Sequence, residues 1–151
     1  MTLFAPGDPR PIHFMGIAGA GMSALAVVAR HLGVAITGCD SDPSGAADLA
    51  ASGVQIWRGH DPGHVNGARA VVVTAAVAGQ HPELERARAL GIPVVRRADA
   101  LGQAVAGGAG GEGGGGGGTV VGVAGTHGKT TTTVMVTEAL AAAGRDPTGL
   151  A

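Results

Sequence analysis

The sequence has few aromatic residues, a small net charge and a single cysteine. Two phenylalanines, one tryptophan and no tyrosine mean that a core must be built mainly from aliphatic side chains. The single cysteine, Cys39, excludes an intramolecular disulfide and fits a reducing compartment. Lys and Arg total 10 and Asp and Glu total 11, so the net charge of −1 provides no basic surface for nucleic acid.

Long apolar runs are also absent. No run approaches the roughly 20 residues that a membrane-spanning helix needs, and the N-terminus lacks the apolar segment of a signal peptide. We therefore expect a cytoplasmic protein that makes no membrane contact. With 151 residues, 45% of them hydrophobic, the chain is long enough for one ordinary folded domain.

From residue 11 to residue 106, short apolar segments alternate with segments rich in Ala and Leu. The pattern predicts strands at 11–16, 34–40, 54–57, 68–76 and 92–97, and helices at 20–33, 45–53, 81–91 and 98–106. Such alternation predicts an α/β fold of the Rossmann-like type, a parallel sheet with helices on both faces.

A glycine-rich segment follows. Ten of the twelve residues at 107–118 are glycine, which predicts a flexible linker between a domain at 1–106 and a second one that begins at 119–151. There, residues 119–125 predict a strand and residues 129–144 a helix, the first βα unit of a P-loop ATPase domain. One strand and one helix cannot bury their apolar faces alone, so we expect an N-terminal portion of a longer protein.

The segment GIAGAGMS, residues 16–23, joins the first predicted strand to the first predicted helix. Glycines let a backbone approach a diphosphate, and a helix N-terminus offers N–H groups and a partial positive charge. The dinucleotide pattern G-x-G-x-x-G is altered, because Ala18 takes its middle position. Asp40, 24 residues after Gly16, stands where an acidic residue often binds a ribose. The simpler interpretations are a plain turn and, for Asp40, a helix cap.

The segment GTHGKTT, residues 125–131, is a variant of the P-loop G-x-x-x-x-G-K-[ST], with Val123 at the position of the first glycine. Its backbone amides can cradle phosphates, Lys129 can bridge the β and γ phosphates, and the Thr130 hydroxyl can coordinate Mg²⁺. The alternative is a Thr-capped helix after a glycine turn, with a solvated lysine.

Together these motifs resemble those of the Mur ligases. HFMGIAGAGMSALA at residues 13–26 precedes GTHGKTTTT at residues 125–133, and the stretch at 71–101 is also similar to a family segment. The resemblance covers about residues 12–150. It departs from the family pattern at three positions: Ala18 and Ala24 stand where the family has glycine, and Cys39 where serine is common.

The resemblance implies an ATP-dependent ligase with Mg²⁺, acting in peptidoglycan precursor synthesis. L-Alanine would be joined to the lactyl carboxylate of UDP-N-acetylmuramate through an acyl phosphate. The chain by itself would lack turnover, because the rest of the ATP pocket and the amino-acid domain would follow it. The alternatives are the sister ligase that attaches a tripeptide, an NAD(P)-binding oxidoreductase domain, and a non-catalytic nucleotide-binding module.

The resemblance also assigns residues to two sites. The UDP-sugar site would contain Gly16, Ala18, Gly19, Ala20, Gly21, Met22, Ser23, Asp40, Thr74, Ala75 and Ala76. The ATP site would contain Gly125, Thr126, His127, Gly128, Lys129, Thr130 and Thr131. Within it, Lys129 and Thr130 would be catalytic and Thr130 would bind Mg²⁺.

The histidines give weaker signals. His13 lies within an apolar strand and is expected to be a hydrogen-bonded core histidine. His127 could contact phosphate or could be a structural loop residue. The sequence spacing of His60, His64 and His81 shows no cysteine or carboxylate pattern that indicates a metal site.

Overall fold

A computed structural model describes residues 3–5, 7–75, 77, 80–108, 121–147 and 149. The chain divides into two compact units, Met1–Gly118 and Thr119–Ala151. The assignment of one unit to a UDP sugar and the other to ATP stays a prediction.

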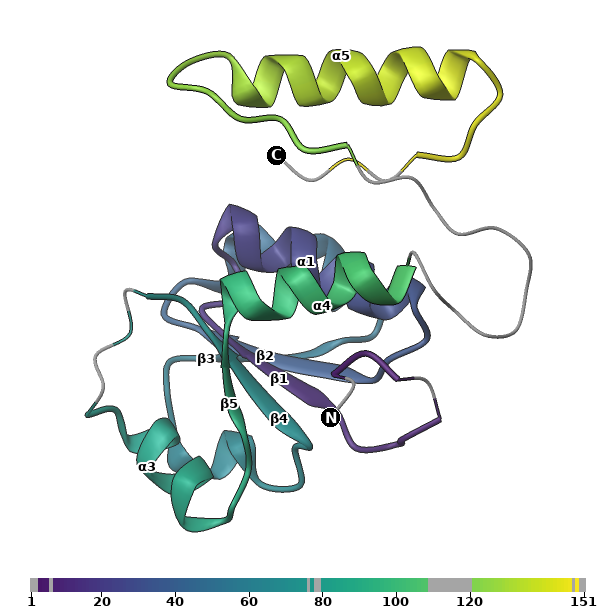
Figure 1. Cartoon of the computed structure of the whole chain (residues 1–151). Helices are drawn as coiled ribbons and strands as arrows, with labels where there is room; N and C mark the ends of the chain where they lie inside the picture. Colours follow the sequence, from purple (N-terminus) through teal and green to yellow (C-terminus); the bar gives the residue numbers. More distant parts are fainter. Residues whose placement is uncertain are drawn as a thin grey trace. The chain divides into compact units, whose positions relative to one another are not determined.

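The first unit is a five-stranded sheet with flanking helices (Figure 1). Its strands are β1 (Ile12–Met15), β2 (Ile36–Asp40), β3 (Gln55–Arg58), β4 (Ala70–Val73) and β5 (Val94–Arg96). Its helices are α1 (Ala20–His31), α2 (Ala47–Ala51), α3 (Pro82–Ala89) and α4 (Arg97–Gly108), with 3₁₀ turns η1 (Pro43–Ala46) and η2 (Pro62–Val65). The expected Rossmann-like α/β fold is therefore confirmed.

All strand pairs are parallel, and the strand order is β3-β2-β1-β4-β5. Ile12 of β1 is in register with Ile36 on one side and with Ala70 on the other. The order reverses at β1, because β2 and β4 flank it. In open parallel sheets the ligand crevice lies at this switch point, beyond the carboxyl ends of the strands.

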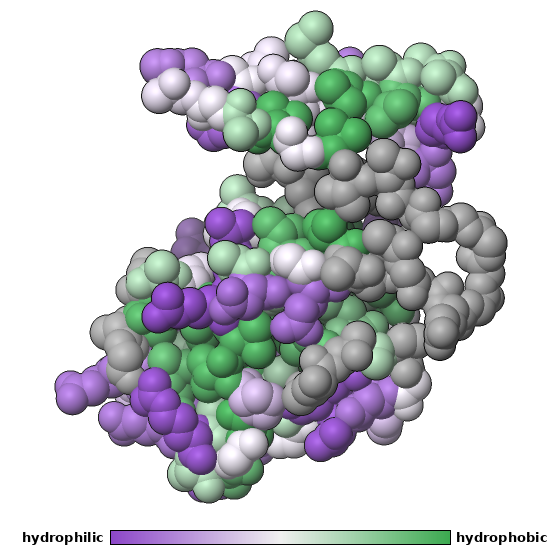
Figure 2. All heavy atoms as spheres, viewed as in Figure 1, coloured by the Kyte–Doolittle hydropathy of each residue, from purple (hydrophilic) through white to green (hydrophobic). Residues whose placement is uncertain are grey.

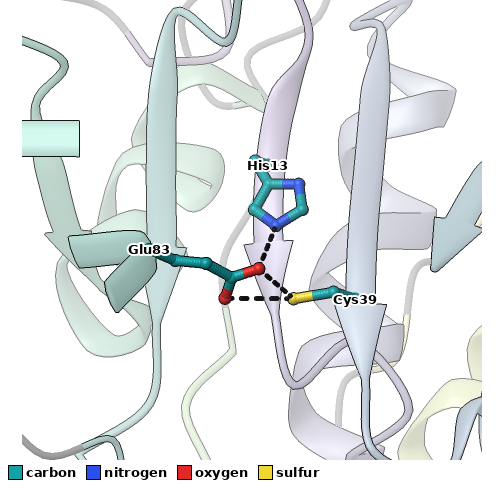
Figure 3. A group of neighbouring side chains, drawn as sticks. All are labelled: His13, Cys39 and Glu83. Carbon is teal, nitrogen blue, oxygen red and sulfur yellow. Dashed lines mark hydrogen bonds and ion pairs between the residues drawn. The ribbon is translucent and has the colours of Figure 1, made fainter. Parts of the chain in front are cut away.

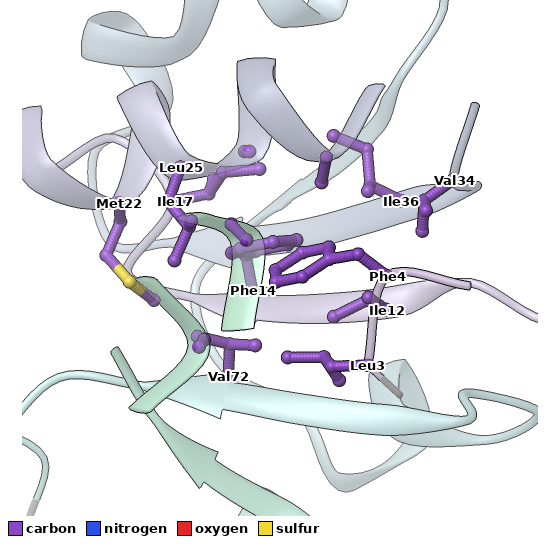
Figure 4. Close-up of a cluster of buried hydrophobic side chains, with 14 of the residues drawn as sticks. Leu3, Phe4, Ile12, Phe14, Ile17, Met22, Leu25, Val34, Ile36 and Val72 are labelled. Atoms are coloured by element: carbon purple, nitrogen blue, oxygen red, sulfur yellow. The ribbon is translucent and has the colours of Figure 1, made fainter. Parts of the chain in front are cut away.

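The larger core covers one face of the sheet, where α1 and α4 lie (Figure 1). Phe14 of β1 packs there with Leu25 of α1 and Val72 of β4 (Figure 4). Helix α4 contributes Ala100 and Ala104, which lie one helical turn apart and are both buried. Alternate residues of each strand face this core, as the period of a β-strand requires.

A smaller core covers the opposite face, against α3. Met15 of β1 and Val71 of β4 pack there with Leu84 and Ala87 of α3. The strands are thus buried on both faces, which explains the continuous apolar run at β4. The other side of α3 carries Glu85, Arg86 and Arg88, and Figure 2 shows hydrophilic side chains in this region.

Gly38 of β2 allows a close approach between the sheet and the loop that follows β1. A Cβ atom at this position would lie 2.5 Å from Ile17 Cδ1 and 2.8 Å from Ile17 Cβ. Ile17 is itself completely buried, so it has little room to move.

Replacing Gly38 with alanine is expected to lower the free energy of unfolding by about 1–3 kcal/mol, because the added methyl overpacks the core. Urea denaturation of the chain, followed by circular dichroism, measures this. Gly102→Ala is the matched control, since a Cβ on this helical glycine meets no atom within 4 Å. The control is expected to be neutral or slightly stabilising. Equal unfolding free energies for G38A and the unmodified chain would contradict the packing argument.

The second unit contains one helix, α5 (Lys129–Ala142), among its described residues. The strand expected at 119–125 is not formed at 121–125, the described part of that segment. A strand needs a neighbour for its backbone hydrogen bonds, and the described residues of this unit supply none. No residue of α5 is buried, and Val134, Met135 and Leu140 are exposed apolar residues. Figure 2 shows apolar side chains on the surface of this unit.

The helix α4 ends later than expected, at Gly108, and so includes the first two residues of the segment predicted as a linker. Burial of Ala100 and Ala104 against the core supports this helix through packing, which outweighs the low helix propensity of glycine at its end. Residues 109–118 of the predicted linker lie outside the described residues. Among the described residues, no helix combines the length and the apolar character needed to cross a membrane.

Candidate functional site

The loop after β1 turns sharply at Gly16, whose φ of +73° lies in the left-handed region that favours glycine. The N–H groups of Gly16 and Ile17 both donate to the carbonyl oxygen of Cys39, at 2.8 and 3.1 Å. The N–H of Gly19 donates to the carbonyl of Gly16 at 3.1 Å. These bonds hold the loop against the carboxyl end of β2, at the switch point of the sheet.

The helix α1 begins directly after this loop, with Gly19 as its N-cap. Gly19 has extended backbone angles and provides no side-chain cap, and the first turn contains no acidic residue. The positive end of the helix dipole is therefore not compensated by a carboxylate of this turn. Gly19 and Ala20 are exposed, so an anion can reach this end of the helix, where the N–H of Gly19 is already bonded to the carbonyl of Gly16.

Met22 and Ser23 lie in the first turn of α1. Both of their N–H groups donate to the carbonyl of Gly19, at 2.8 Å each. The side chain of Met22 is buried in the larger core (Figure 4). These two amides thus form the first helical turn, and their contact with a diphosphate stays a prediction.

Asp40 links the loops after β1 and β2. One carboxylate oxygen accepts a hydrogen bond from the N–H of Ala18 at 3.0 Å, and the other accepts one from the N–H of Asp42 at 3.0 Å. The simpler interpretation of Asp40 as a helix cap is wrong, because Asp42 caps the 3₁₀ turn η1 by accepting from Ser44. A contact between Asp40 and the uridine stays a prediction.

Arg97 is a residue that the sequence interpretation missed. A Cβ atom on Gly21 would lie 2.8 Å from Arg97 Nη1 and 3.2 Å from Arg97 Cζ. The guanidinium therefore lies against the first turn of α1, in space that only a glycine leaves open. The available signal was the pair Arg96 and Arg97 at the carboxyl end of β5, an end that shares an edge of the sheet with the loop after β1.

Thr74 and Ala75 follow β4 at the same edge of the sheet. The carbonyl of Thr74 accepts a hydrogen bond from the N–H of Val77 at 3.3 Å, which makes a turn. Thr74 is half-buried and Ala75 is exposed. Ala76, the third residue expected in this loop, lies outside the described residues.

The second glycine loop precedes α5. Gly128 has a φ of +77° and is the N-cap of the helix, without a side-chain cap. The Nζ atom of Lys129 donates to the carbonyl of Gly125 at 2.9 Å, so the lysine folds back across the loop. The alternative of a Thr-capped helix is wrong, since the cap is a glycine. Thr130 and Thr131 lie in the first helical turn, and both are exposed.

The remaining loop residues, Thr126 and His127, are also exposed. The structure brings the predicted ATP residues together in one loop and helix turn, with the backbone amides of an uncapped helix at its centre. The sequence interpretation of this loop as a phosphate-binding loop stays a prediction.

His13 is completely buried, as expected of a core histidine. Burial lowers its pKa to about 4, because the protonated ring loses its hydration. Its Nδ1 atom lies 3.1 Å from Thr37 Oγ1, whereas its Nε2 atom has no hydrogen-bond partner. The expectation of a fully hydrogen-bonded histidine is therefore wrong for one of its two nitrogens. Burial likewise raises the pKa of the Cys39 thiol.

The chain matches a known protein family. Residues 11–108 match the model of the Mur ligase family, catalytic domain.

Two similar proteins are UDP-N-acetylmuramate–L-alanine ligases by name. The chain is 44% identical over 148 residues to a UDP-N-acetylmuramate–L-alanine ligase of Cutibacterium acnes, covering 97% of this chain and 29% of the relative. It is 48% identical over 138 residues to the enzyme of the same name from an Arthrobacter species, covering 91% of this chain and 27% of the relative. The chain thus spans under a third of the length of these relatives.

Solved structures agree with this result. A murein peptide ligase from Psychrobacter arcticus is 34% identical, with a TM-score of 0.76, over 89% of this chain and 27% of that one. A UDP-N-acetylmuramate–alanine ligase from Thermotoga maritima is 32% identical, with a TM-score of 0.58, over 60% of this chain and 21% of that one.

Proposed function

The chain belongs to the Mur ligase family, and from this premise we propose that it forms the nucleotide-binding part of an ATP-dependent ligase that joins L-alanine to UDP-N-acetylmuramate. The names of its relatives support this substrate pair. A cytoplasmic location and the absence of nucleic-acid and membrane partners belong to the same proposal.

The observation that carries the proposal is the open N-terminus of α1 at the switch point. An uncapped helix start with exposed Gly19 and Ala20 suits a diphosphate, and Arg97 adds a full positive charge beside Gly21. Neutralising two phosphate charges requires more than the half charge of a helix dipole. We therefore place the UDP diphosphate at the first turn of α1, beside the Arg97 guanidinium that packs against Gly21.

The second glycine loop would hold ATP. Lys129 would leave the carbonyl of Gly125 and pair with the β and γ phosphates, since an ammonium group binds phosphate more strongly than a neutral carbonyl. The exposed Thr130 hydroxyl in the first turn of α5 is a hard oxygen donor, which fits Mg²⁺. When bound, Mg²⁺ would neutralise charge on the γ phosphate.

These charges would permit the first chemical step. The lactyl carboxylate and the γ phosphate are both anionic, so they repel each other until the phosphate is neutralised. Lys129 is the only lysine of the chain and would supply one positive charge at this point. The amine of L-alanine would then attack the acyl phosphate, and inorganic phosphate would leave.

Isothermal titration calorimetry of the chain tests the first site. We expect saturable binding of UDP-N-acetylmuramate and no binding of NADH. Saturable NADH binding, with no response to the UDP sugar, would instead support the oxidoreductase alternative. Phosphate release by the full-length ligase, with L-alanine or with a tripeptide, distinguishes the two Mur ligase activities.

A further inference from the structure

The side chain of Glu83 is the centre of a cluster of potential metal ligands on the α3 face of the sheet. Glu83 lies in the first turn of α3 and is completely buried. Its carboxylate contacts Cys39 Sγ at 3.3 and 3.4 Å, His60 Nδ1 at 3.1 Å and His64 Nδ1 at 2.9 Å (Figure 3 shows the first of these). No part of the UDP-sugar or ATP proposals uses this cluster.

A buried carboxylate needs a compensating charge, because the loss of hydration is costly. The ring nitrogens of four histidines lie within 4.0 Å of the Glu83 carboxylate oxygens: His13, His60, His64 and His81. A neutral imidazole provides hydrogen bonds but no net charge. The N-terminus of α3 provides about half a positive charge. A cation in the cluster would complete the compensation.

Three donor atoms already have the spacing of a coordination site. Cys39 Sγ lies 3.3 Å from His60 Nδ1, His60 Nδ1 lies 3.1 Å from Glu83 Oε2, and Glu83 Oε2 lies 3.4 Å from Cys39 Sγ. In a tetrahedral Zn²⁺ site, with Zn–S near 2.3 Å and Zn–N near 2.0 Å, neighbouring donors are roughly 3.3–3.6 Å apart. Two sides of the triangle fall within this range, and the third, from His60 Nδ1 to Glu83 Oε2 at 3.1 Å, is slightly shorter, so the triangle is close to one face of such a tetrahedron.

His13 offers a fourth donor. Its Nε2 atom is buried without a hydrogen-bond partner and points toward Glu83 Oε1, at 4.0 Å (Figure 3). Its ligand atom and those of Cys39 and Glu83 all lie within 4.8 Å of one another. The other ring nitrogen lies 3.1 Å from Thr37 Oγ1, as expected for a metal-binding histidine that is oriented by its second nitrogen.

We propose that His13, Cys39, His60 and Glu83 form a Zn²⁺-binding site. A thiolate and imidazoles favour Zn²⁺ over the hard cations Mg²⁺ and Ca²⁺. On binding, the Cys39 S–H bond breaks, the sulfur bonds to Zn²⁺ and the proton passes to solvent. The thiolate and the Glu83 carboxylate then balance the two charges of the metal. His60, whose side chain is 34% exposed, provides the route from solvent.

The neighbouring histidines have supporting positions. His64 contacts the other oxygen of Glu83 and can hold the carboxylate in place, as partners of metal ligands commonly do. His81 Nδ1 accepts a hydrogen bond from the N–H of Glu83 and caps α3, so we do not include it among the ligands.

Titration of the metal-free chain with Co²⁺, followed by absorption spectroscopy, tests the proposal. We expect one equivalent to bind, with a near-ultraviolet thiolate-to-cobalt charge-transfer band and the visible bands of a tetrahedral ion. Zn²⁺ should remove these bands, and each bound Zn²⁺ should release one proton. A folded chain that shows no charge-transfer band would overturn the proposal and leave a hydrogen-bonded network.

Variants locate the site. Cys39→Ser should abolish the charge-transfer band, and both Cys39→Ser and His60→Gln should weaken Zn²⁺ binding at least about tenfold, measured by competition with a chromogenic chelator. His31→Gln is the matched control, because His31 is exposed at the end of α1. Circular dichroism verifies folding. Unchanged Zn²⁺ affinity in folded Cys39→Ser would also overturn the proposal. If a variant does not fold, the Co²⁺ titration of the unmodified chain still tests the site.

Discussion

Replacing Lys129 with alanine in the full-length ligase is expected to slow phosphate release from ATP by a factor of about 10²–10³, the usual loss when one charge-stabilising donor is removed. Lys129 folds across the loop to the carbonyl of Gly125, at 2.9 Å, and can turn from there to a phosphate. Phosphate release with UDP-N-acetylmuramate and L-alanine present measures the effect.

Two controls make this prediction specific. Arg145→Ala removes a positive charge from the same unit, at an exposed residue after α5, and should leave the rate unchanged. The affinity of the Lys129→Ala enzyme for UDP-N-acetylmuramate should also be unchanged, since the first site lies in a different unit. A normal rate in Lys129→Ala would show that the lysine only stabilises its loop.

Replacing Arg97 with alanine is expected to weaken the binding of UDP-N-acetylmuramate about 10- to 150-fold. This range corresponds to about 1.5–3 kcal/mol, typical of a hydrogen bond to a charged group. The physical reason is the position of the guanidinium against Gly21, at the open start of α1. Calorimetric titration of the chain measures the dissociation constant directly.

Arg96→Ala is the matched control for this experiment. Arg96 and Arg97 are adjacent and both exposed, so the two variants lose the same charge from almost the same place. The atoms nearest to a Cβ on Gly21 all belong to Arg97, so we expect only the Arg97 variant to lose affinity. Equal losses in both variants would indicate a general electrostatic effect, and no loss in Arg97→Ala would exclude the proposed contact.

Local sequence patterns predicted the first unit well. The alternation of strand-like and helix-like segments predicted the parallel Rossmann-like sheet, and each strand lies near its expected place. Side chains repeat about every 2 residues in a strand and about every 3.6 residues in a helix, so the two kinds of segment are easy to distinguish. The prediction of a strand at 119–125 was wrong for residues 121–125, because a strand forms only with a neighbouring strand, which is often distant in sequence.

Asp40 is a single residue whose contacts the sequence could not predict, because one partner is distant in sequence. Its position at the end of β2 was recognisable from the sequence, and a role as ribose ligand or helix cap followed from spacing. Its actual hydrogen bonds reach Ala18 and Asp42. The bond to Ala18 joins the loop after β1 to the end of β2, so only the folded sheet could reveal it.

The sequence by itself determined the strands and helices of the first unit, the two glycine loops and the family, since these depend on neighbouring residues. The tertiary structure decided which distant residues meet. Parallel strands bring their carboxyl ends to one edge, and alternation directs every second side chain to the same face. For this reason three donor atoms, Cys39 Sγ, His60 Nδ1 and Glu83 Oε2, lie within 3.4 Å of one another. The sequence spacing of these residues does not indicate a metal site.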